Sequence, residues 1–97
     1  MMYYIDRIEV KNINNKKGLA LKQFIKDYEQ CLIRDRDKVE EVVSTIRRKV
    51  GELNTAYPRT SPLTTGRLAD SVYCYAENRP GDHVFFFKIK KIMKVYE

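Results

Sequence analysis

The sequence predicts an α+β domain in which helices pack on one face of a small antiparallel sheet that ends in a β-hairpin. Two observations carry this prediction. Apolar residues recur at helical spacing through residues 21–53, and β-prone segments lie at 3–10 and 68–89. A chain of 97 residues suits one domain, since domains cluster near about 100–150 residues. We therefore expect residues 1–97 to fold as a single unit around one core.

The first half of the chain predicts a short strand followed by helix. Residues 3–10 are β-branched and aromatic, which favours a strand, and the asparagine-rich residues 11–18 indicate a loop. The helical stripe then comprises Leu21, Phe24, Ile25, Tyr28, Cys31, Leu32, Val39, Val42, Val43, Ile46, Val50 and Leu53. It fits either one helix over 19–55 or two helices that break near Arg34–Asp37, where an aspartate would be the N-cap.

The second half predicts a loop and a terminal hairpin. Residues 54–66 contain two prolines and four threonines, which indicates a loop rather than a helix. Residues 68–77 alternate as a strand does, and residues 84–89 are the most β-prone segment of the chain. The turn residues 79–82 join them into an antiparallel hairpin. Residues 90–97 fit either an extension of the last strand or a short helix. The edges of such a three-stranded sheet favour pairing with another subunit.

Composition and charge exclude several classes of protein. Lysine and arginine number 19 against 13 aspartates and glutamates, and the net charge of +6 suits a polyanionic or acidic partner. No apolar run reaches the roughly 20 residues that a membrane helix needs. Asp6, Arg7 and Glu9 lie where a signal peptide would be apolar. We therefore expect a protein that is neither secreted nor membrane-spanning.

The sequence contains no recognisable catalytic or metal motif. It has no glycine-rich phosphate loop, no HExxH and no CxxC. Cys31 and Cys74 lie among apolar residues, which predicts core positions in a reducing compartment, and His83 follows a turn. Glu40 and Glu41 are adjacent on a helix and so do not share a face. We expect no catalytic residues, metal, cofactor or small-molecule ligand.

Basic residues form two clusters that are candidates for contact with nucleic acid or an acidic partner. One lies late in the helix, where cations also favour the macrodipole, and the other lies on the last strand and tail. Together with Arg67, the candidates are Arg47, Arg48, Lys49, Arg67, Lys88, Lys90, Lys91 and Lys94. Lys88 and Lys90 project from one face of a strand, where Tyr73 and Tyr75 of the neighbouring strand add rings for stacking. The alternative interpretation is a solvated sheet face whose lysines prevent aggregation.

The most specific motif is the segment from Pro62 to Val72, which reads PLTTGRLADSV. From its residues alone it is a turn, in which Gly66 permits a positive φ and Leu68 and Val72 enter the sheet. A charged helix, then P-x-x-T-G-x-L-x-x-S-V and an antiparallel strand pair, resembles the head–tail connector and tail-completion (minor tail protein) family of tailed phages. The resemblance covers about residues 38–89. It is carried by Pro62, Thr65, Gly66, Leu68 and Ser71.

This resemblance implies a β–α–β–β domain that assembles into a ring at the phage neck or tail end and has no catalytic residues. We accordingly expect a non-enzymatic structural protein of the virion or host cytoplasm, with the five motif residues at an oligomer interface. Its partners would be further copies of itself, in a ring, and neighbouring virion proteins. The basic surface would face DNA, RNA or an acidic partner.

A second resemblance leads to a different function. The segment DRDKVEEVV and the basic end FFFKIKKIMKVYE are similar to ribosome-dependent mRNA-cleaving toxins of toxin–antitoxin modules. Those enzymes use basic and aromatic side chains on a sheet face to activate a ribose hydroxyl. The residues that this resemblance implies are Arg67, Tyr73, Tyr75, Lys88, Lys90 and Lys91, although the arginine-rich middle strand of such toxins is absent. A third hypothesis is a small basic adaptor or inhibitor protein of a mobile element.

Overall fold

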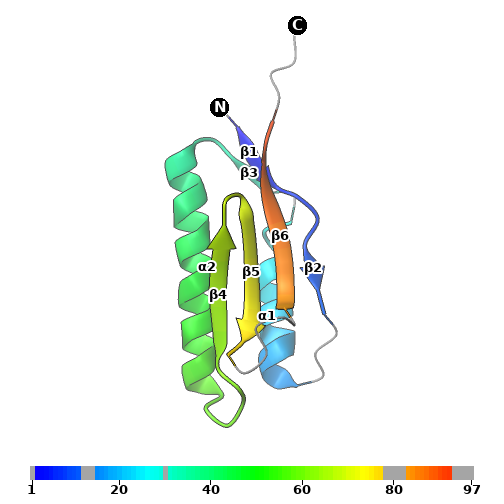
Figure 1. Cartoon of the computed structure of the whole chain (residues 1–97), viewed down its shortest axis with the longest axis vertical. Helices are drawn as coiled ribbons and strands as arrows, with labels where there is room; N and C mark the ends of the chain where they lie inside the picture. The colour runs from blue at the N-terminus through cyan, green and yellow to red at the C-terminus, as the bar shows by residue number, and fades with distance from the viewer. Residues whose placement is uncertain (1, 12–14, 30, 78–82, 93–97) are drawn as a thin grey trace, which may run out of the picture.

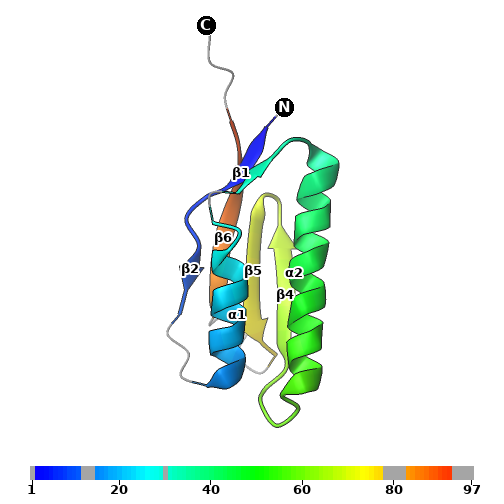
Figure 2. The same ribbon diagram turned by 180° about the vertical axis from the view of Figure 1, so that it is seen from behind.

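A computed structural model describes residues 2–11, 15–29, 31–77 and 83–92 of the chain. Within these residues, the elements in order are β1 (Tyr3–Ile5), β2 (Glu9–Val10), α1 (Lys16–Lys26), β3 (Leu32–Ile33), α2 (Arg36–Ala56), β4 (Leu63–Leu68), β5 (Ser71–Ala76) and β6 (His83–Lys91). All strands join one antiparallel sheet, and both helices cover the same face of it (Figures 1 and 2). The predicted α+β class is confirmed.

The last strand, β6, is the centre of the sheet. The strand order is β3-β1-β6-β5-β4, and β2 pairs with β6 off this path. β1 pairs with the end of β6, where Tyr4 lies opposite Lys90, and β2 pairs near its beginning, where Glu9 lies opposite Phe86. The edges of the sheet are β3 and β4, at the two ends of this order, and β2, which pairs with β6 alone among the described strands. The sheet therefore has six described strands rather than the three predicted.

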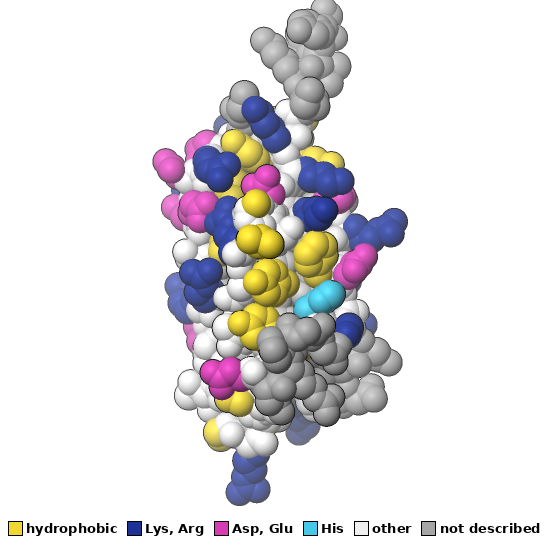
Figure 3. Space-filling model, in the orientation of Figure 1, with side chains coloured by type: hydrophobic (Ala, Val, Ile, Leu, Met, Phe, Trp, Pro, Cys, Tyr) yellow, Lys and Arg dark blue, Asp and Glu magenta, His cyan; other side chains and the backbone are white. Residues whose placement is uncertain are grey.

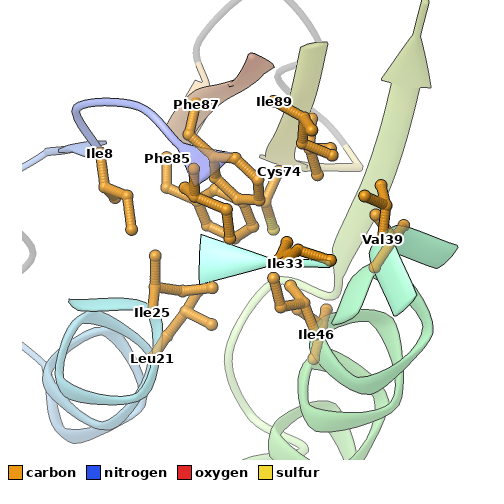
Figure 4. Close-up of a cluster of buried hydrophobic side chains, with 14 of the residues drawn as sticks. Ile8, Leu21, Ile25, Ile33, Val39, Ile46, Cys74, Phe85, Phe87 and Ile89 are labelled. Carbon is orange, nitrogen blue, oxygen red and sulfur yellow. The ribbon is translucent and has the colours of Figure 1, made fainter. Parts of the chain in front are cut away.

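The hydrophobic core lies between the sheet and the helices. Because side chains alternate along a strand, every second residue of β5 and β6 points toward the helices. Figure 4 shows these residues packed against α1 and α2. The core consists of Ile5, Ile8, Leu21, Ile25, Ile33, Val39, Val43, Ile46, Val50, Leu53, Val72, Cys74, Phe85, Phe87 and Ile89. The predicted helical stripe supplies most of the helix side of this core.

The N-terminal segment differs from its prediction in two respects. The strand predicted over 3–10 is two short strands, because Ile5 and Ile8 are both buried and residues three apart cannot share one face of a continuous strand. The loop predicted over 11–18 ends early, since α1 begins at Lys16. Asn15 is its N-cap, and the Asn15 side chain accepts from the Gly18 N–H at 2.7 Å.

The stretch predicted as one or two helices contains two. The second, α2, begins after Asp35, whose carboxylate accepts from the Lys38 N–H at 3.0 Å, so the expected aspartate cap is confirmed. Between the helices, β3 pairs with β1, and the sequence pattern gave no sign of this strand. Leu32 of the predicted helical stripe belongs to β3 and is 61% exposed. The apolar residues between α1 and α2 therefore keep helical spacing by coincidence, because this segment is not helical.

The predicted loop over 54–66 is also corrected. The helix α2 continues to Ala56 and ends before Pro58, and β4 already begins at Leu63. Two β-favouring threonines lie within that strand, and their preference prevailed over the neighbouring prolines. The strand predicted over 68–77 therefore starts as the end of β4, turns at Ala69, which has a φ of 53°, and resumes as β5.

The predicted antiparallel pairing of the last two strands is confirmed by β5 and β6. The turn expected at 79–82 lies outside the described residues. Of the two alternatives for 90–97, the strand holds as far as Lys91, and residues 93–97 lie outside the described residues.

A buried charge ties α1 to the segment that precedes β4. Lys17 is only 3% exposed, and its Nζ donates to the Ser61 carbonyl at 3.1 Å. Burial lowers the pKa of Lys17 below its usual value, because the ammonium is partly removed from water. The bond fixes the approach to β4, the strand that carries most of the sequence motif.

Candidate functional site: an open sheet face and a free edge

The sheet face that points away from the helices carries aromatic rings. The rings of Tyr73 and Tyr75 stack with centroids 5.8 Å apart, and the His83 ring lies 5.8 Å from that of Phe86. Tyr73 is opposite Phe86 in the strand register, so these four half-buried residues form one patch, called here the aromatic row. Figure 3 shows hydrophobic side chains along the middle of this face, with lysines and arginines at its sides.

Charged side chains border the aromatic row. Strand alternation puts Lys88 and Lys90 on the same face as Phe86, Tyr73 and Tyr75, which is the arrangement the sequence predicted. The Lys90 Nζ lies 2.8 Å from the Asp6 carboxylate. This hydrogen bond lowers the pKa of Asp6 and raises the pKa of Lys90. Beside Phe86 is an open pocket of about 300 Å³, lined by Asp6, Arg7, Glu9, Phe86 and Lys88.

Gly66 has a different role from the one predicted. No described glycine has a positive φ, and Gly66 lies inside β4 directly opposite Tyr73. A Cβ on Gly66 would lie 2.5 Å from the Tyr73 ring, so this position is glycine because the ring covers the backbone there. An aromatic side chain over a cross-strand glycine also replaces the packing that the glycine lacks. Gly66 thus leaves the space that the Tyr73 ring of the aromatic row occupies.

The outer edge of β4 is partly capped. The Asn54 side chain donates to the Leu63 carbonyl and accepts from the Leu63 N–H, both at 2.9 Å, as a neighbouring strand would do. Since Leu63 directs its backbone outward, so do Thr65 and Arg67, two and four residues along the same strand. A groove of about 220 Å³ runs between α2 and this edge. It is lined by Arg47, Val50, Gly51, Asn54, Leu63, Thr64 and Thr65.

The remaining motif residues lie at the ends of the β4–β5 hairpin. Leu68 ends β4 opposite Ser71 and is 73% exposed, the highest value among the exposed large hydrophobic residues described. Pro62 precedes β4, and its carbonyl accepts from the Glu77 N–H at 3.0 Å, which closes the other end of the hairpin. The structure therefore brings all five motif residues together on one hairpin at the edge of the sheet.

The basic cluster of the helix does not join the basic residues of the sheet. Consecutive helical residues point about 100° apart, so Arg47, Arg48 and Lys49 face different ways. Arg47 lines the groove beside β4, the Arg48 Nε lies 3.9 Å from the Glu52 carboxylate, and the Lys49 Nζ lies 5.4 Å from the centre of the Phe24 ring. All three belong to the helical layer, on the far side of the sheet from the aromatic row. Lys94 lies outside the described residues.

The residues implied by the toxin resemblance are divided between the two faces. Tyr73, Tyr75, Lys88 and Lys90 share the open face. Arg67 lies on the helix side, where its guanidinium pairs with the Glu40 carboxylate of α2. The register pairs Lys91 with Tyr3, one position beyond the Tyr4–Lys90 pair of the open face, so Lys91 also falls outside that set. The six residues therefore do not form one cluster.

Neither cysteine belongs to this site. Cys74 is fully buried, and burial raises the pKa of its thiol to about 12, an effect that the neighbouring Thr65 hydroxyl only partly offsets. Cys31 is half-buried and unpaired. Within the described part of the chain, no group of three or more histidine, cysteine or acidic residues could hold a metal ion.

Phe86, Asp6 and Glu9 are parts of the open face that sequence reasoning missed. A signal for Phe86 was available, because the alternation that pairs Lys88 with Lys90 also includes residue 86. No comparable signal existed for Asp6 and Glu9, whose positions depend on pairing between the two ends of the chain.

Comparison with family models, curated proteins and solved structures finds no match. Among the helices described, neither is long and apolar enough to cross a membrane.

Proposed function

We propose that this chain is a non-enzymatic structural subunit of a tailed-phage particle, a head–tail connector or tail-completion subunit that acts by oligomeric assembly. The observation that carries the proposal is the position of the motif. Pro62, Thr65, Gly66, Leu68 and Ser71 all lie on the β4–β5 hairpin at an edge of the sheet. Edge strands are where a second chain can continue a sheet.

Two further features of the hairpin support assembly at this edge. Leu68 presents a largely exposed apolar side chain at the tip of the hairpin. The backbone N–H and C=O groups of Thr65 and Arg67 point away from β5. Among the described residues, none forms a hydrogen bond with them. A neighbouring subunit that paired with β4 and covered Leu68 would satisfy both features at once. A contact between this edge and a different surface of the next copy would generate a ring if its rotation closes.

Light scattering coupled to size exclusion, over a range of protein concentrations, tests this proposal. We expect a wild-type assembly of several copies that Leu68→Glu disrupts. Leu19→Glu is the matched control, because Leu19 is also an exposed leucine, at 55%, but lies on α1. A wild-type monomer at every concentration would overturn the proposal, as would an equal loss of assembly in both variants.

A further inference from the structure

The open face combines three features that a ligand with flat apolar rings and negative charges would require. The aromatic row presents ring surfaces that no described helix covers. The pocket beside Phe86 has a polar lining. Two cations, Arg7 and Lys88, line the same pocket. These features involve β5, β6, β2 and the two residues Asp6 and Arg7 that precede it. Gly66 of β4 lies beneath the Tyr73 ring, but neither Leu68 nor the outer backbone edge of β4 takes part.

The pocket beside Phe86 contains both hydrogen-bond donors and acceptors. Arg7 and Lys88 can donate, and the carboxylates of Asp6 and Glu9 can accept. The edges of nucleobases likewise carry both kinds of group, and carboxylates accept from their exocyclic amino groups. At about 300 Å³ the pocket is open to solvent and lies directly beside an aromatic ring. A base that stacked on Phe86 could therefore place its edge in this pocket.

The charges on this face favour a nucleic acid whose bases, as well as its phosphates, are accessible. Among the described residues, Lys88 forms no ion pair, whereas Lys90 is held by Asp6 at 2.8 Å. The chain as a whole carries a net charge of +6. The two carboxylates would repel a duplex, which exposes mainly phosphates and hides the flat surfaces of its bases. A single strand can turn its bases toward Asp6 and Glu9 and its phosphates toward Lys88 and Arg7.

We propose that the open sheet face binds single-stranded nucleic acid, with bases stacked on Tyr73 and Phe86, one base edge in the pocket of Asp6 and Glu9, and phosphates on Lys88 and Arg7. Single-strand binding proteins use the same combination of stacking rings and cations. The inference is independent of the phage assignment.

Fluorescence anisotropy with a labelled 12-nucleotide single strand of mixed sequence tests this inference, with DNA and RNA strands measured separately and the DNA duplex as a third probe. We expect single strands to bind more tightly than the duplex. Phe86→Ala and Tyr73→Ala should each weaken single-strand binding about fivefold or more, the loss expected for one stacked base. Lys88→Ala should reduce the slope of log K against log salt by about 0.7, the value for one phosphate contact on a single strand.

Arg48→Ala is the matched control, because Arg48 is an exposed cation on the helical layer and should leave single-strand binding unchanged. Circular dichroism of Phe86→Ala and Tyr73→Ala checks that both remain folded. Equal binding of duplex and single strand, or unchanged binding in both aromatic variants, would overturn the proposal. So would a self-association that Phe86→Ala abolishes without any binding of the probes, since the face would then be occupied by a second copy. Leu68→Glu should retain strand binding even if it loses assembly.

Discussion

The two faces of the sheet are built from the same strands but are held in different ways. On β6, Phe85 and Phe87 point toward the helices and are fully buried, whereas Phe86 between them points outward and is half-buried. The inner rings contact side chains from α1, α2 and β5 (Figure 4). The outer ring contacts mainly its neighbours on the open face. The inner face therefore supplies most of the packing between the sheet and the helices, and the outer face borders solvent.

The largest expected effect on stability comes from replacing two adjacent phenylalanines of β6, Phe87 on the inner face and Phe86 on the outer face. Phe87→Ala should lower the free energy of unfolding by about 3–5 kcal/mol, because it removes a buried ring and leaves a cavity. Phe86→Ala should lower it by only about 1–2 kcal/mol, since that ring is half-buried and its loss leaves no enclosed cavity. Urea denaturation measures both. Equal losses would mean that the open face is part of the core.

Cys74 offers a second contrast, because it lies on β5 between Tyr73 and Tyr75 but points inward. The pKa of its thiol is raised from 9.0 to about 12, so its contribution to stability is complete below pH 9 and is lost as the pH rises toward 12. The loss should be about 1 kcal/mol for each pH unit in that window. The lowered pKa of Lys17 acts in the opposite direction, since its penalty fades as the pH rises toward 10.5.

Denaturation of wild type and Cys74→Ala at pH 8 and pH 10 measures the effect of the cysteine, because the burial of Lys17, the largest cause of its lowered pKa, is common to both proteins. The free-energy difference between the two proteins should shrink at pH 10. Val72→Ala provides the matched control, because it shortens another buried side chain of β5 and removes no ionisable group, and its free-energy difference from wild type should be the same at both pH values. A Cys74→Ala protein with the same pH dependence as wild type would contradict the burial of the thiol.

A smaller effect is expected from an added methyl group at each of two glycines. Gly66→Ala should displace the Tyr73 ring, because the new Cβ would lie 2.5 Å from it, and should reduce the Tyr73–Tyr75 stacking seen in the near-ultraviolet circular dichroism. Gly51→Ala meets nothing within 4 Å and lies inside α2, so it should stabilise the protein by about 0.5–1 kcal/mol and leave the tyrosine signal unchanged. An unchanged signal in both variants would contradict the proximity of Gly66 to Tyr73.

The smallest effect should come from the ion pair on the open face. Asp6→Asn should leave the denaturation midpoint at pH 7 unchanged, since exposed pairs contribute little. The lowered pKa of Asp6 means that whatever stability the pair adds is present above pH 3.8 and is lost as the pH falls further. A large shift of the midpoint at pH 7 would show that this pair supports the fold.

Local patterns in the sequence predicted the class, the helical stripe, the Asp35 cap and the β5–β6 pairing. They failed where pairing between distant segments decided the outcome. β3 has only two residues and exists because β1 is beside it, and β4 was hidden by its prolines and threonines. The positive φ expected at Gly66 was wrong for the same reason, since Tyr73, which occupies its Cβ position, comes from the next strand. Of the open face, the two tyrosines and two lysines were predictable from alternation, and the acidic residues were not.

The central place of β6 has a consequence for synthesis on the ribosome. β1 and β2 are made first, yet both pair with β6, which is the last of the described strands, and β1 pairs also with β3. Until β6 has left the ribosome, a nascent chain can form α1, α2 and the β4–β5 hairpin, but the sheet remains in two pieces. Folding must therefore be completed after translation has passed residue 91, and a chain released before β6 would expose the inner faces of β1 and β5 to aggregation.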